Sequence, residues 1–282
     1  TALLFKSNLS KDEGSLTYMP LSAPGKIAEV TVKGLRHKGI GELVDVKQVK
    51  SNRFLIEYNI DGCSWVYEGD FRLSKGVPTF EITKTIVGLP PLSQGVVLGI
   101  FFELKDKEDP TTADYVLAFT KANIPSQIYL LPHGKELIKL SEERVLGIDQ
   151  KFLSEGEDAS YTSFDGVRIS ARLYTPSEQL GFKGPRPLVL YVHGGPQSQE
   201  RPDFTWFSMP LIQFLTLNGF AVFVPNVRGS TGYGLKFMKA VDRDWGGKDM
   251  KDHVEGLKTL EKDPRIDSSR RAVIGRSYGG YM

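Results

Sequence analysis

The sequence is poor in the residues that build metal sites and covalent crosslinks. Its 282 residues include one cysteine, Cys63, and four histidines, His37, His133, His193 and His253. A single cysteine cannot form an intrachain disulfide or a cysteine-built zinc site, which fits a reducing compartment. No two of the histidines have the spacing of a metal-binding motif. We therefore expect no bound metal, and we expect Cys63 to be a small buried apolar residue.

An excess of one charge and long apolar runs are also missing. Thirty-six basic and 34 acidic residues give a formal net charge of +2, which does not favour nucleic acid or anionic lipid as a partner. No apolar run approaches the roughly 20 residues that cross a bilayer, and no charged-then-apolar leader opens the chain. We expect a cytoplasmic protein with no membrane partner, although a chain that begins with Thr1 rather than Met says little about leaders.

Residues 1–155 have the pattern of an all-β segment. Residues 54–58 and 64–68 are rich in β-branched and aromatic side chains, and Asn59-Ile60-Asp61-Gly62 between them predicts a hairpin. Turn-forming residues bound further predicted strands at 96–104, 115–120, 127–131 and 136–140. Many short strands predict a sandwich, a barrel or propeller blades, and periodicity does not choose among them.

Residues 156–282 alternate between apolar strands and amphipathic segments. The predicted strands are 187–192, 220–224 and 272–274, and the predicted helices are 205–218 and 247–262. The first helix should bury a stripe that stops before Gly219, a C-cap residue; the stripe consists of Phe207, Leu211, Phe214, Leu215 and Leu217. The second should bury Met250, Val254 and Leu257. This order of elements predicts a parallel sheet covered on both faces, an α/β fold.

The third predicted strand leads directly into Gly275-Arg276-Ser277-Tyr278-Gly279. A serine in such a G-x-S-x-G turn between strand and helix is held in a strained backbone conformation with its hydroxyl exposed. We predict that Ser277 is a catalytic nucleophile. The alternative interpretation is a glycine-rich turn with an incidental serine.

An acyl-transfer serine needs hydrogen-bond donors aimed at the developing oxyanion. One predicted donor is the backbone N–H of Tyr278, the residue after the nucleophile. The other is the backbone N–H of Gly195, within His193-Gly194-Gly195-Pro196 after the strand that ends at Val192, where missing side chains let the backbone approach a substrate. A plain turn made of glycine and proline is the alternative.

Three motifs in this order resemble the prolyl oligopeptidase family of serine peptidases, in its acylaminoacyl-peptidase or dipeptidyl-peptidase branch. They are residues 191–196, 226–234 and 275–282, and residues 161–169 are similar to the family's entry into its catalytic domain. The resemblance implies that residues 1–155 are the C-terminal blades of a β-propeller. It also implies that residues 156–282 are the first part of an α/β-hydrolase domain, truncated after the nucleophile turn.

In this hydrolase fold the triad aspartate and histidine follow the serine in the chain, and only five residues follow Ser277. We therefore expect the 282 residues to be an incomplete part of a longer polypeptide, inactive by themselves. His193 should have a structural role in the oxyanion loop. His253 should be a solvated or capping residue on the polar flank of its helix. Neither is expected to act as the base.

Several other residues receive structural interpretations. Arg228 and Asp165 should be anchors in loops, and Arg276 stands where the relatives commonly have a small residue. Tyr233 is a candidate to face the substrate. A neighbouring group of aromatic residues should belong to the helix core rather than to a specificity pocket: Phe204, Trp206 and Phe207.

The resemblance implies a serine peptidase that hydrolyses short peptides through an acyl-enzyme on Ser277, without a cofactor. A propeller lid would admit short peptides and reject folded proteins, and a homo-oligomer is compatible with the sequence. Two alternatives remain open: a carboxylesterase or lipase of the same hydrolase fold, and a non-catalytic propeller-hydrolase interaction protein. The sequence does not separate endopeptidase, dipeptidyl-peptidase and acylaminoacyl-peptidase specificity.

Overall fold

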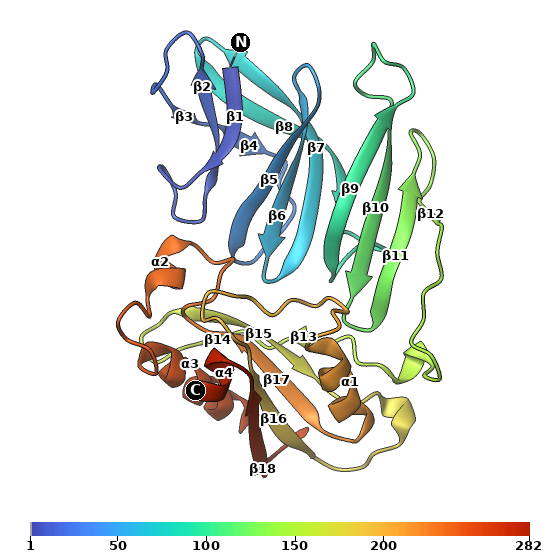
Figure 1. Ribbon diagram of the computed structural model, residues 1–282, viewed down its shortest axis with the longest axis vertical. Helices are drawn as coiled ribbons and strands as arrows, with labels where there is room; N and C mark the ends of the chain where they lie inside the picture. Colours follow the sequence, from blue (N-terminus) through green and yellow to red (C-terminus); the bar gives the residue numbers. More distant parts are fainter. Residues whose placement is uncertain (1) are drawn as a thin grey trace. The chain divides into compact units, whose positions relative to one another are not determined.

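The computed structural model describes residues 2–282 and divides them into two compact units (Figure 1). The first unit contains the chain up to residue 119 together with residues 127–142 and 232–235. The second contains residues 120–126, 143–231 and 236–282. None of the helices in residues 2–282 is long and apolar enough to cross a membrane.

The first unit consists of three β-sheets. Strands β1 (Ala2–Ser7), β2 (Ser15–Pro20) and β3 (Ala28–Glu29) form the first sheet. The second has the order β4-β8-β7-β6-β5, where β4 is Thr31–Lys33, β5 Gly41–Lys50, β6 Arg53–Ile60, β7 Cys63–Ser74 and β8 Val77–Val87. The third has the order β12-β11-β10-β9, with β9 Val96–Leu104, β10 Ala113–Lys121, β11 Ile124–Leu131 and β12 Ile138–Lys139. The all-β pattern predicted for this part is confirmed.

The predicted hairpin is present as β6 and β7, which pair antiparallel from Arg53 opposite Asp70 to Ile60 opposite Cys63. Asp61 and Gly62 form the two-residue turn and both have positive φ, +48° and +83°. That backbone matches the twist of the flanking strands, which is why Asp-Gly favours tight hairpins. Cys63 is buried, as expected.

A buried ion pair ties the strands of the second sheet together. Arg53 on β6 donates to Glu68 on β7 at 2.5 Å, to Asp70 at 2.9 Å and to Thr83 on β8 at 3.0 Å. Glu68 is almost fully buried, so its charge depends on this guanidinium for compensation. The cross-strand contact therefore fixes the register of three neighbouring strands.

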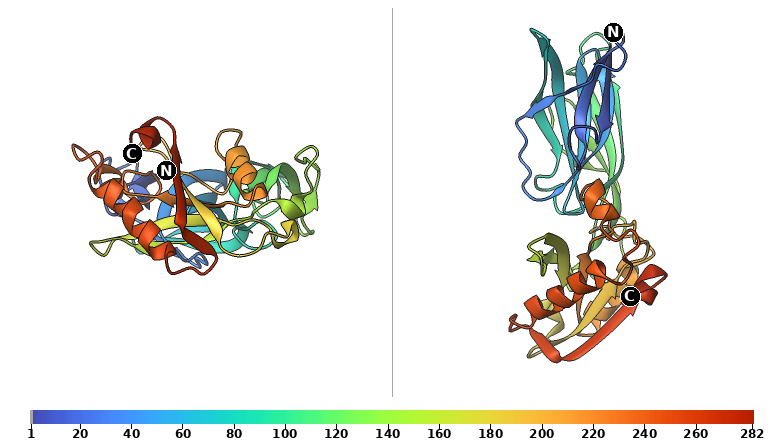
Figure 2. Two further views of the ribbon diagram at one scale, coloured as in Figure 1. Left: turned by 90° about the horizontal axis from the view of Figure 1, so that it is seen from below. Right: turned by 90° about the vertical axis from the view of Figure 1, so that its left-hand side faces the viewer.

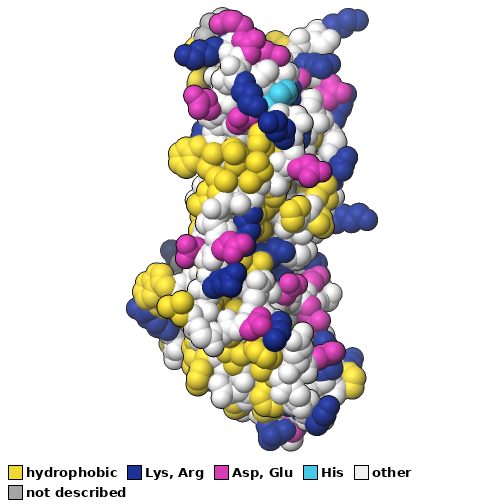
Figure 3. All heavy atoms as spheres, turned by 90° about the vertical axis from the view of Figure 1, so that its right-hand side faces the viewer, with side chains coloured by type: hydrophobic (Ala, Val, Ile, Leu, Met, Phe, Trp, Pro, Cys, Tyr) yellow, Lys and Arg dark blue, Asp and Glu magenta, His cyan; other side chains and the backbone are white. Residues whose placement is uncertain are grey.

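Some apolar side chains of the third sheet remain exposed. Figure 3 views the side of the molecule where β12 lies and shows apolar side chains gathered there among charged ones. The exposed apolar residues of β9 to β12 are Leu98, Phe101, Val116, Ile128 and Ile138.

The second unit contains a six-stranded sheet with helices on both faces. The main order is β13-β15-β17-β16-β18, and β14 pairs with β15. The strands are β13 (Glu157–Asp158), β14 (Tyr161–Thr162), β15 (Arg168–Tyr174), β16 (Arg186–Val192), β17 (Ala221–Asn226) and β18 (Ile266–Gly275). Strands β17, β16 and β18 are parallel, whereas β15 runs antiparallel to β17. The predicted α/β pattern with a parallel sheet is confirmed.

Two short and two longer helices accompany this sheet. They are α1 (Met209–Leu217), α2 (Leu235–Lys239), α3 (Lys248–Leu260) and α4 (Tyr278–Tyr281), with 3₁₀ turns η1 (Gln150–Phe152) and η2 (Glu178–Leu180). Along β16, Leu188 and Leu190 point to the core that includes Leu260 of α3, while Val189 and Tyr191 point to the core of α1. Figure 2 shows α1 and α3 on opposite sides of the sheet.

The last strand is less covered than predicted. Residues 270–275 of β18 are exposed, including Val273 and Ile274 at 61% and 36%. Strand β18 lies at the edge of the sheet. Within residues 2–282, the expectation of a sheet covered on both faces therefore holds for β16 and β17 but not for β18.

The first predicted helix begins later and buries only part of the predicted stripe. It starts at Met209, and its buried residues are Met209, Ile212, Gln213 and Thr216. Of the predicted stripe, Leu211 and Leu215 pack against the core, whereas Phe207 and Phe214 are exposed. Gln213 is buried because its amide is satisfied by the backbone: it donates to Ala122 O and Ser154 O and accepts from Ser154 N. The helix ends before Gly219, whose φ is +87°, as predicted.

The predicted stripe of the second helix is wrong at two of its three residues, because only Leu257 packs against the core. Helix α3 buries Asp249, Asp252, His253, Gly256 and Leu260, while Met250 and Val254 are 46% and 42% exposed. His253, expected to be solvated or capping, is only 5% exposed. Both buried carboxylates have hydrogen-bond partners, so the polar flank of the helix can face inward at little cost.

The burial of His253 predicts a loss of stability in acid. Neither ring nitrogen has a partner among residues 2–282, and burial, followed by the nearby His193, lowers the pKa of His253 to about 3. The unfolded value is near 6.5, so stability falls as the pH drops from about 6.5 towards 3, because only the unfolded chain takes up the proton. By pH 5 the loss should be about 2 kcal/mol.

We expect His253→Leu to remove this part of the pH dependence. Urea denaturation at pH 8 and pH 5, followed by tryptophan fluorescence, measures the difference. His133→Leu, at an exposed position, is the matched control and should leave the wild-type slope unchanged. Equal pH slopes for the two variants would contradict the burial argument.

Candidate active site

Ser277 stands in a sharp turn between β18 and α4. Its φ of +54° and ψ of −123° are unusual for a residue with a side chain, and the residue is exposed. A Cβ on Gly275 would lie 2.2 Å from Gly279 O, and a Cβ on Gly279 would lie 2.0 Å from Val192 O. Only glycine fits at these two positions, because helix α4 packs so closely against the ends of β16 and β18.

The glycine pair after β16 lies directly against this turn. A Cβ on Gly194 would be 3.4 Å from Ser277 Cβ and 4.0 Å from Ser277 Oγ. Gly195 follows with φ +130°. Tyr278 is the first residue of α4, and its N–H therefore has no intrahelical acceptor. The structure thus brings Ser277, Tyr278 and the segment containing Gly195 together, while their catalytic roles stay predictions.

The loop that carries the glycine pair is tied to residues 226–231, the loop after β17. Hydrogen bonds join them at three places. His193 Nε2 pairs with Ser230 Oγ at 2.9 Å, and Thr231 N donates to Ser198 O at 2.9 Å. The side-chain amide of Asn226 accepts from Glu200 N at 2.8 Å and donates to Glu200 O at 2.9 Å. Backbone groups take part in two of the three. The position of the glycine pair therefore depends on the position of the second loop.

The second loop is anchored in turn by Arg228. Its Nη2 and Nε donate to the two oxygens of Asp252 at 2.6 and 3.0 Å, its backbone N donates to Asp252 Oδ2 at 3.1 Å, and its Nη1 donates to Asp165 at 2.5 Å. Ser163 Oγ adds a further bond to Asp252 at 2.5 Å. Arg228 and Asp252 are 4% and 0% exposed. The interpretation of Arg228 and Asp165 as structural anchors is confirmed.

These contacts shift the pKa values of the charged groups. Burial opposes the charge on Arg228, but hydrogen bonds to Asp252 and Asp165 outweigh it and raise the pKa of the guanidinium. The bond from Arg228 lowers the pKa of Asp165. In the loop after β16, burial raises the pKa of Glu200 to about 7 although Ser208 donates to its carboxylate.

A second buried carboxylate, that of Asp249, anchors the turn that contains Ser277. Tyr278 donates its hydroxyl to Asp249, which is fully buried at the start of α3. The Trp245 ring packs edge-on against Tyr278 with 5.3 Å between centroids, and Tyr281 donates to Trp245 O at 3.3 Å. Periodicity missed this use of Asp249, because it assigned the polar side of α3 to solvent.

Neither histidine near the site is hydrogen-bonded to Ser277 within residues 2–282. His193 has Gly194 O at 2.7 Å from Nδ1 and Ser230 at Nε2, and burial lowers its pKa. This agrees with the structural role expected for it. No histidine follows Ser277 in this chain.

The aromatic residues ahead of α1 do not form helix core as expected. Trp206 and Phe207 are 85% and 42% exposed, because α1 begins only at Met209. The Arg276 guanidinium lies 4.3 Å from the centroid of the Phe207 ring, which gives the large residue before the serine a partner. Only Phe204 packs against the core of this unit. Tyr233, expected to face the substrate, is buried instead.

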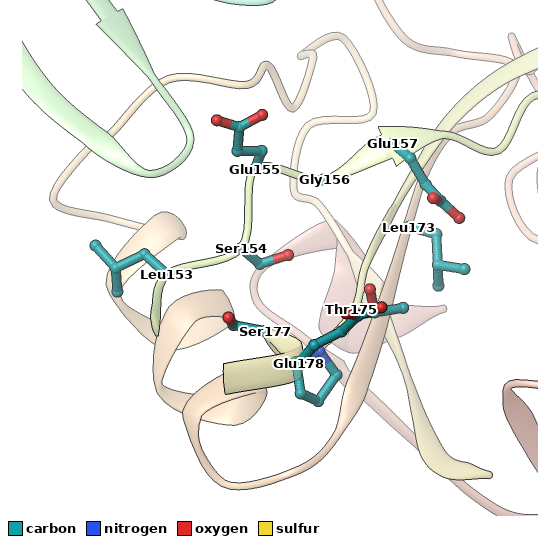
Figure 4. Close-up of a pocket in the computed structure, with 10 residues that line it drawn as sticks. Leu153, Ser154, Glu155, Gly156, Glu157, Leu173, Thr175, Ser177 and Glu178 are labelled. Carbon is teal, nitrogen blue, oxygen red and sulfur yellow. The ribbon is translucent and has the colours of Figure 1, made fainter. Parts of the chain in front are cut away.

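A cleft of about 550 Å³ adjoins the loop after β16 and is lined by Gln197, Asp242, Arg243 and Trp245. A second hollow of about 300 Å³ is formed by residues 153–157, 173 and 175–178 (Figure 4). Figure 4 shows the carboxylates of Glu155 and Glu157 pointing in different directions. None of its lining residues belongs to the loops around Ser277. No group of three His, Cys, Asp or Glu side chains in residues 2–282 could hold a metal ion.

Comparison with known proteins supports the family resemblance. Residues 205–282 match the sequence profile of the prolyl oligopeptidase family. Over 179 residues the chain is 36% identical to the uncharacterized peptidase YuxL of Bacillus subtilis, covering 61% of this chain and 26% of that protein. Over 97 residues it is 37% identical to dipeptidyl aminopeptidase BIII of Pseudoxanthomonas mexicana, covering 34% and 14%. The chain thus spans about a quarter or less of these relatives.

Solved structures share the fold at low sequence identity. An acylaminoacyl peptidase from Pyrococcus horikoshii superposes with a TM-score of 0.65 at 19% identity, covering 99% of this chain and 40% of that one. A structure from a study of two prolyl endopeptidases gives 0.70 at 21%, covering 99% and 38%. These likenesses concern the fold alone.

The buried Arg228–Asp252 pair predicts a large cost when one partner is removed. Arg228→Met leaves the Asp252 charge buried and uncompensated, which should lower the free energy of unfolding by about 3–5 kcal/mol. The double variant Arg228→Met/Asp252→Leu removes both charges and should cost less than Arg228→Met alone. Chemical denaturation measures both.

Lys258→Met is the matched control, because Lys258 pairs with Glu255 at the surface and such pairs contribute about 1 kcal/mol or less. If Arg228→Met cost no more than Lys258→Met, the anchoring role of Arg228 would be refuted.

Proposed function

We propose that the chain belongs to the prolyl oligopeptidase family, whose profile matches residues 205–282, and that the polypeptide carrying it is a serine peptidase acting on short peptides. The observation that carries the proposal is the strained turn of Ser277 facing Gly194. An exposed hydroxyl that lies 4.0 Å from where a Cβ on Gly194 would stand has room beside it for a substrate carbonyl.

In the proposed reaction Ser277 Oγ attacks the carbonyl carbon of a peptide bond while a base takes the hydroxyl proton. The carbonyl oxygen becomes an oxyanion, stabilised by the backbone N–H groups of Tyr278 and Gly195. The C–N bond then breaks, the amine leaves with the proton, and water hydrolyses the acyl-serine ester. We place the triad aspartate and histidine after Met282, following the chain order of this fold.

The proposal also states to which domain each of the two parts of the chain belongs. Residues 1–155 would be the last blades of a β-propeller, because β5 to β8 and β9 to β12 each form four neighbouring strands of a sheet. Residues 156–282 would be the first part of an α/β-hydrolase domain. In the whole polypeptide a propeller domain would admit short peptides and exclude folded proteins.

A fluorophosphonate probe tests the nucleophile in the whole polypeptide. We expect covalent labelling of Ser277, loss of labelling in Ser277→Ala, and a fall in kcat of about 10⁶-fold. Ser269→Ala, at a serine in the same strand, is the control and should be labelled like the wild type. The 282 residues by themselves should remain unlabelled, since a serine without its base is a weak nucleophile.

Substrate comparison separates the peptidase from an esterase. Peptide and N-acylaminoacyl substrates should be hydrolysed with higher kcat/KM than p-nitrophenyl esters of similar size. Labelling that persists in Ser277→Ala would refute the nucleophile, whereas labelling at Ser277 with activity on esters alone would refute the peptidase and retain the hydrolase.

A further inference from the structure

We propose that the cleft lined by Gln197, Asp242, Arg243 and Trp245 is a subsite that binds one carboxylate group of a peptide, with Arg243 as the specificity-determining residue. The inference rests on the proposed function for its placement beside the reacting bond. It goes further by naming a charged group on the peptide that the site would select.

The cleft is built from the same segments that carry the predicted oxyanion donors. Gln197 is two residues after Gly195, and a Cβ on Gly195 would lie 2.7 Å from Gln197 N. On the opposite wall, the Trp245 ring packs against the Tyr278 ring. A peptide held at Ser277 would therefore have the cleft directly within reach of its neighbouring residues.

The guanidinium of Arg243 is available for a ligand. Within residues 2–282 it forms no ion pair and no hydrogen bond, and the side chain is exposed. Other arginines of this unit are paired with carboxylates, for example Arg265 with Glu157 and Arg271 with Glu261. Arg276 beside Ser277 also lacks an ion pair in the described residues, but its guanidinium lies over the Phe207 ring. Among the same residues, Arg243 lacks such a ring contact as well and lines a cleft.

The turn that presents Arg243 is fixed in spite of an unusual backbone. Arg243 has φ +60°, a conformation that long side chains seldom adopt. The turn is held by the buried side chain of Val241 and by hydrogen bonds from Asp244 N to Val241 O at 3.0 Å and from Gly247 N to Asp244 O at 2.9 Å. Local strain kept in place by its surroundings is common at ligand sites.

The chemistry of the lining matches a peptide with one carboxylate. A guanidinium binds a carboxylate through two parallel hydrogen bonds. Trp245 is 57% exposed and offers a flat apolar surface to a side chain, and the Gln197 amide can donate to and accept from a peptide bond. Asp242 would repel a second carboxylate. The carboxylate could be the C-terminus of the peptide or an Asp or Glu side chain.

Binding to the Ser277→Ala protein tests the subsite without requiring hydrolysis. Calorimetric titration would use Ala-Ala, Ala-Ala-amide, Ala-Glu-amide and Ala-Gln-amide as probes. Tighter binding of Ala-Ala than of its amide identifies the C-terminus, and tighter binding of Ala-Glu-amide than of Ala-Gln-amide identifies a side chain. We expect about a tenfold preference for the carboxylate in one of these pairs, equivalent to about 1.4 kcal/mol.

Arg243→Gln should abolish the preference for the carboxylate, so that the two probes of a pair bind with about equal affinity. Arg243→Lys should retain only part of the preference. Lys262→Gln makes the same change in charge at an exposed position outside the cleft and should leave the preference at tenfold. Equal affinity within both pairs, no binding of any probe, or a preference that survives in Arg243→Gln would overturn the proposal. A carboxylate preference in a protein that the fluorophosphonate does not label would uphold the subsite and refute the peptidase.

Discussion

The ion pair between Arg228 and Asp252 is the contact on which the geometry around Ser277 depends. It is inaccessible to solvent, and it joins the loop after β17 to helix α3. That loop holds the glycine loop after β16 through side-chain and backbone hydrogen bonds. The glycine loop in turn lies against the serine turn. Three segments distant in the sequence are thereby placed by one buried charge pair.

Successive side chains of strand β16 point to opposite faces of the sheet, and this alternation positions a helix on each face. Leu188 and Leu190 pack towards α3, and Val189 and Tyr191 pack towards α1, so both helices are positioned by the same strand. The chain then leaves β16 at Val192 and enters the glycine loop without an intervening spacer. Small shifts of either helix would be transmitted to the strand end, because packed interiors do not deform continuously.

The sequence predicted the elements and the serine turn well, because their signals are local. An Asp-Gly turn and a G-x-S-x-G pentapeptide each act within a few residues. The sequence did not fully predict which faces of α1 and α3 are buried. Gln213, Asp249 and Asp252 are buried because they form hydrogen bonds with residues far away in the chain. Hydrophobicity assigns such residues to solvent, and only the folded chain reveals their partners. His253 was misplaced for the same reason.

The hydrogen bonds that tether the glycine loop leave one of its positions open to substitution. The tethering hydrogen bonds are formed by the buried side chain of His193 and by the backbone of Ser198 and Glu200. The side chain of Gln197, which lies between these residues in the sequence, is exposed. Tethered and untethered positions thus lie within one short segment. Substitutions at Gln197 would change the exposed surface of the loop while its tethers to the neighbouring loop stay in place.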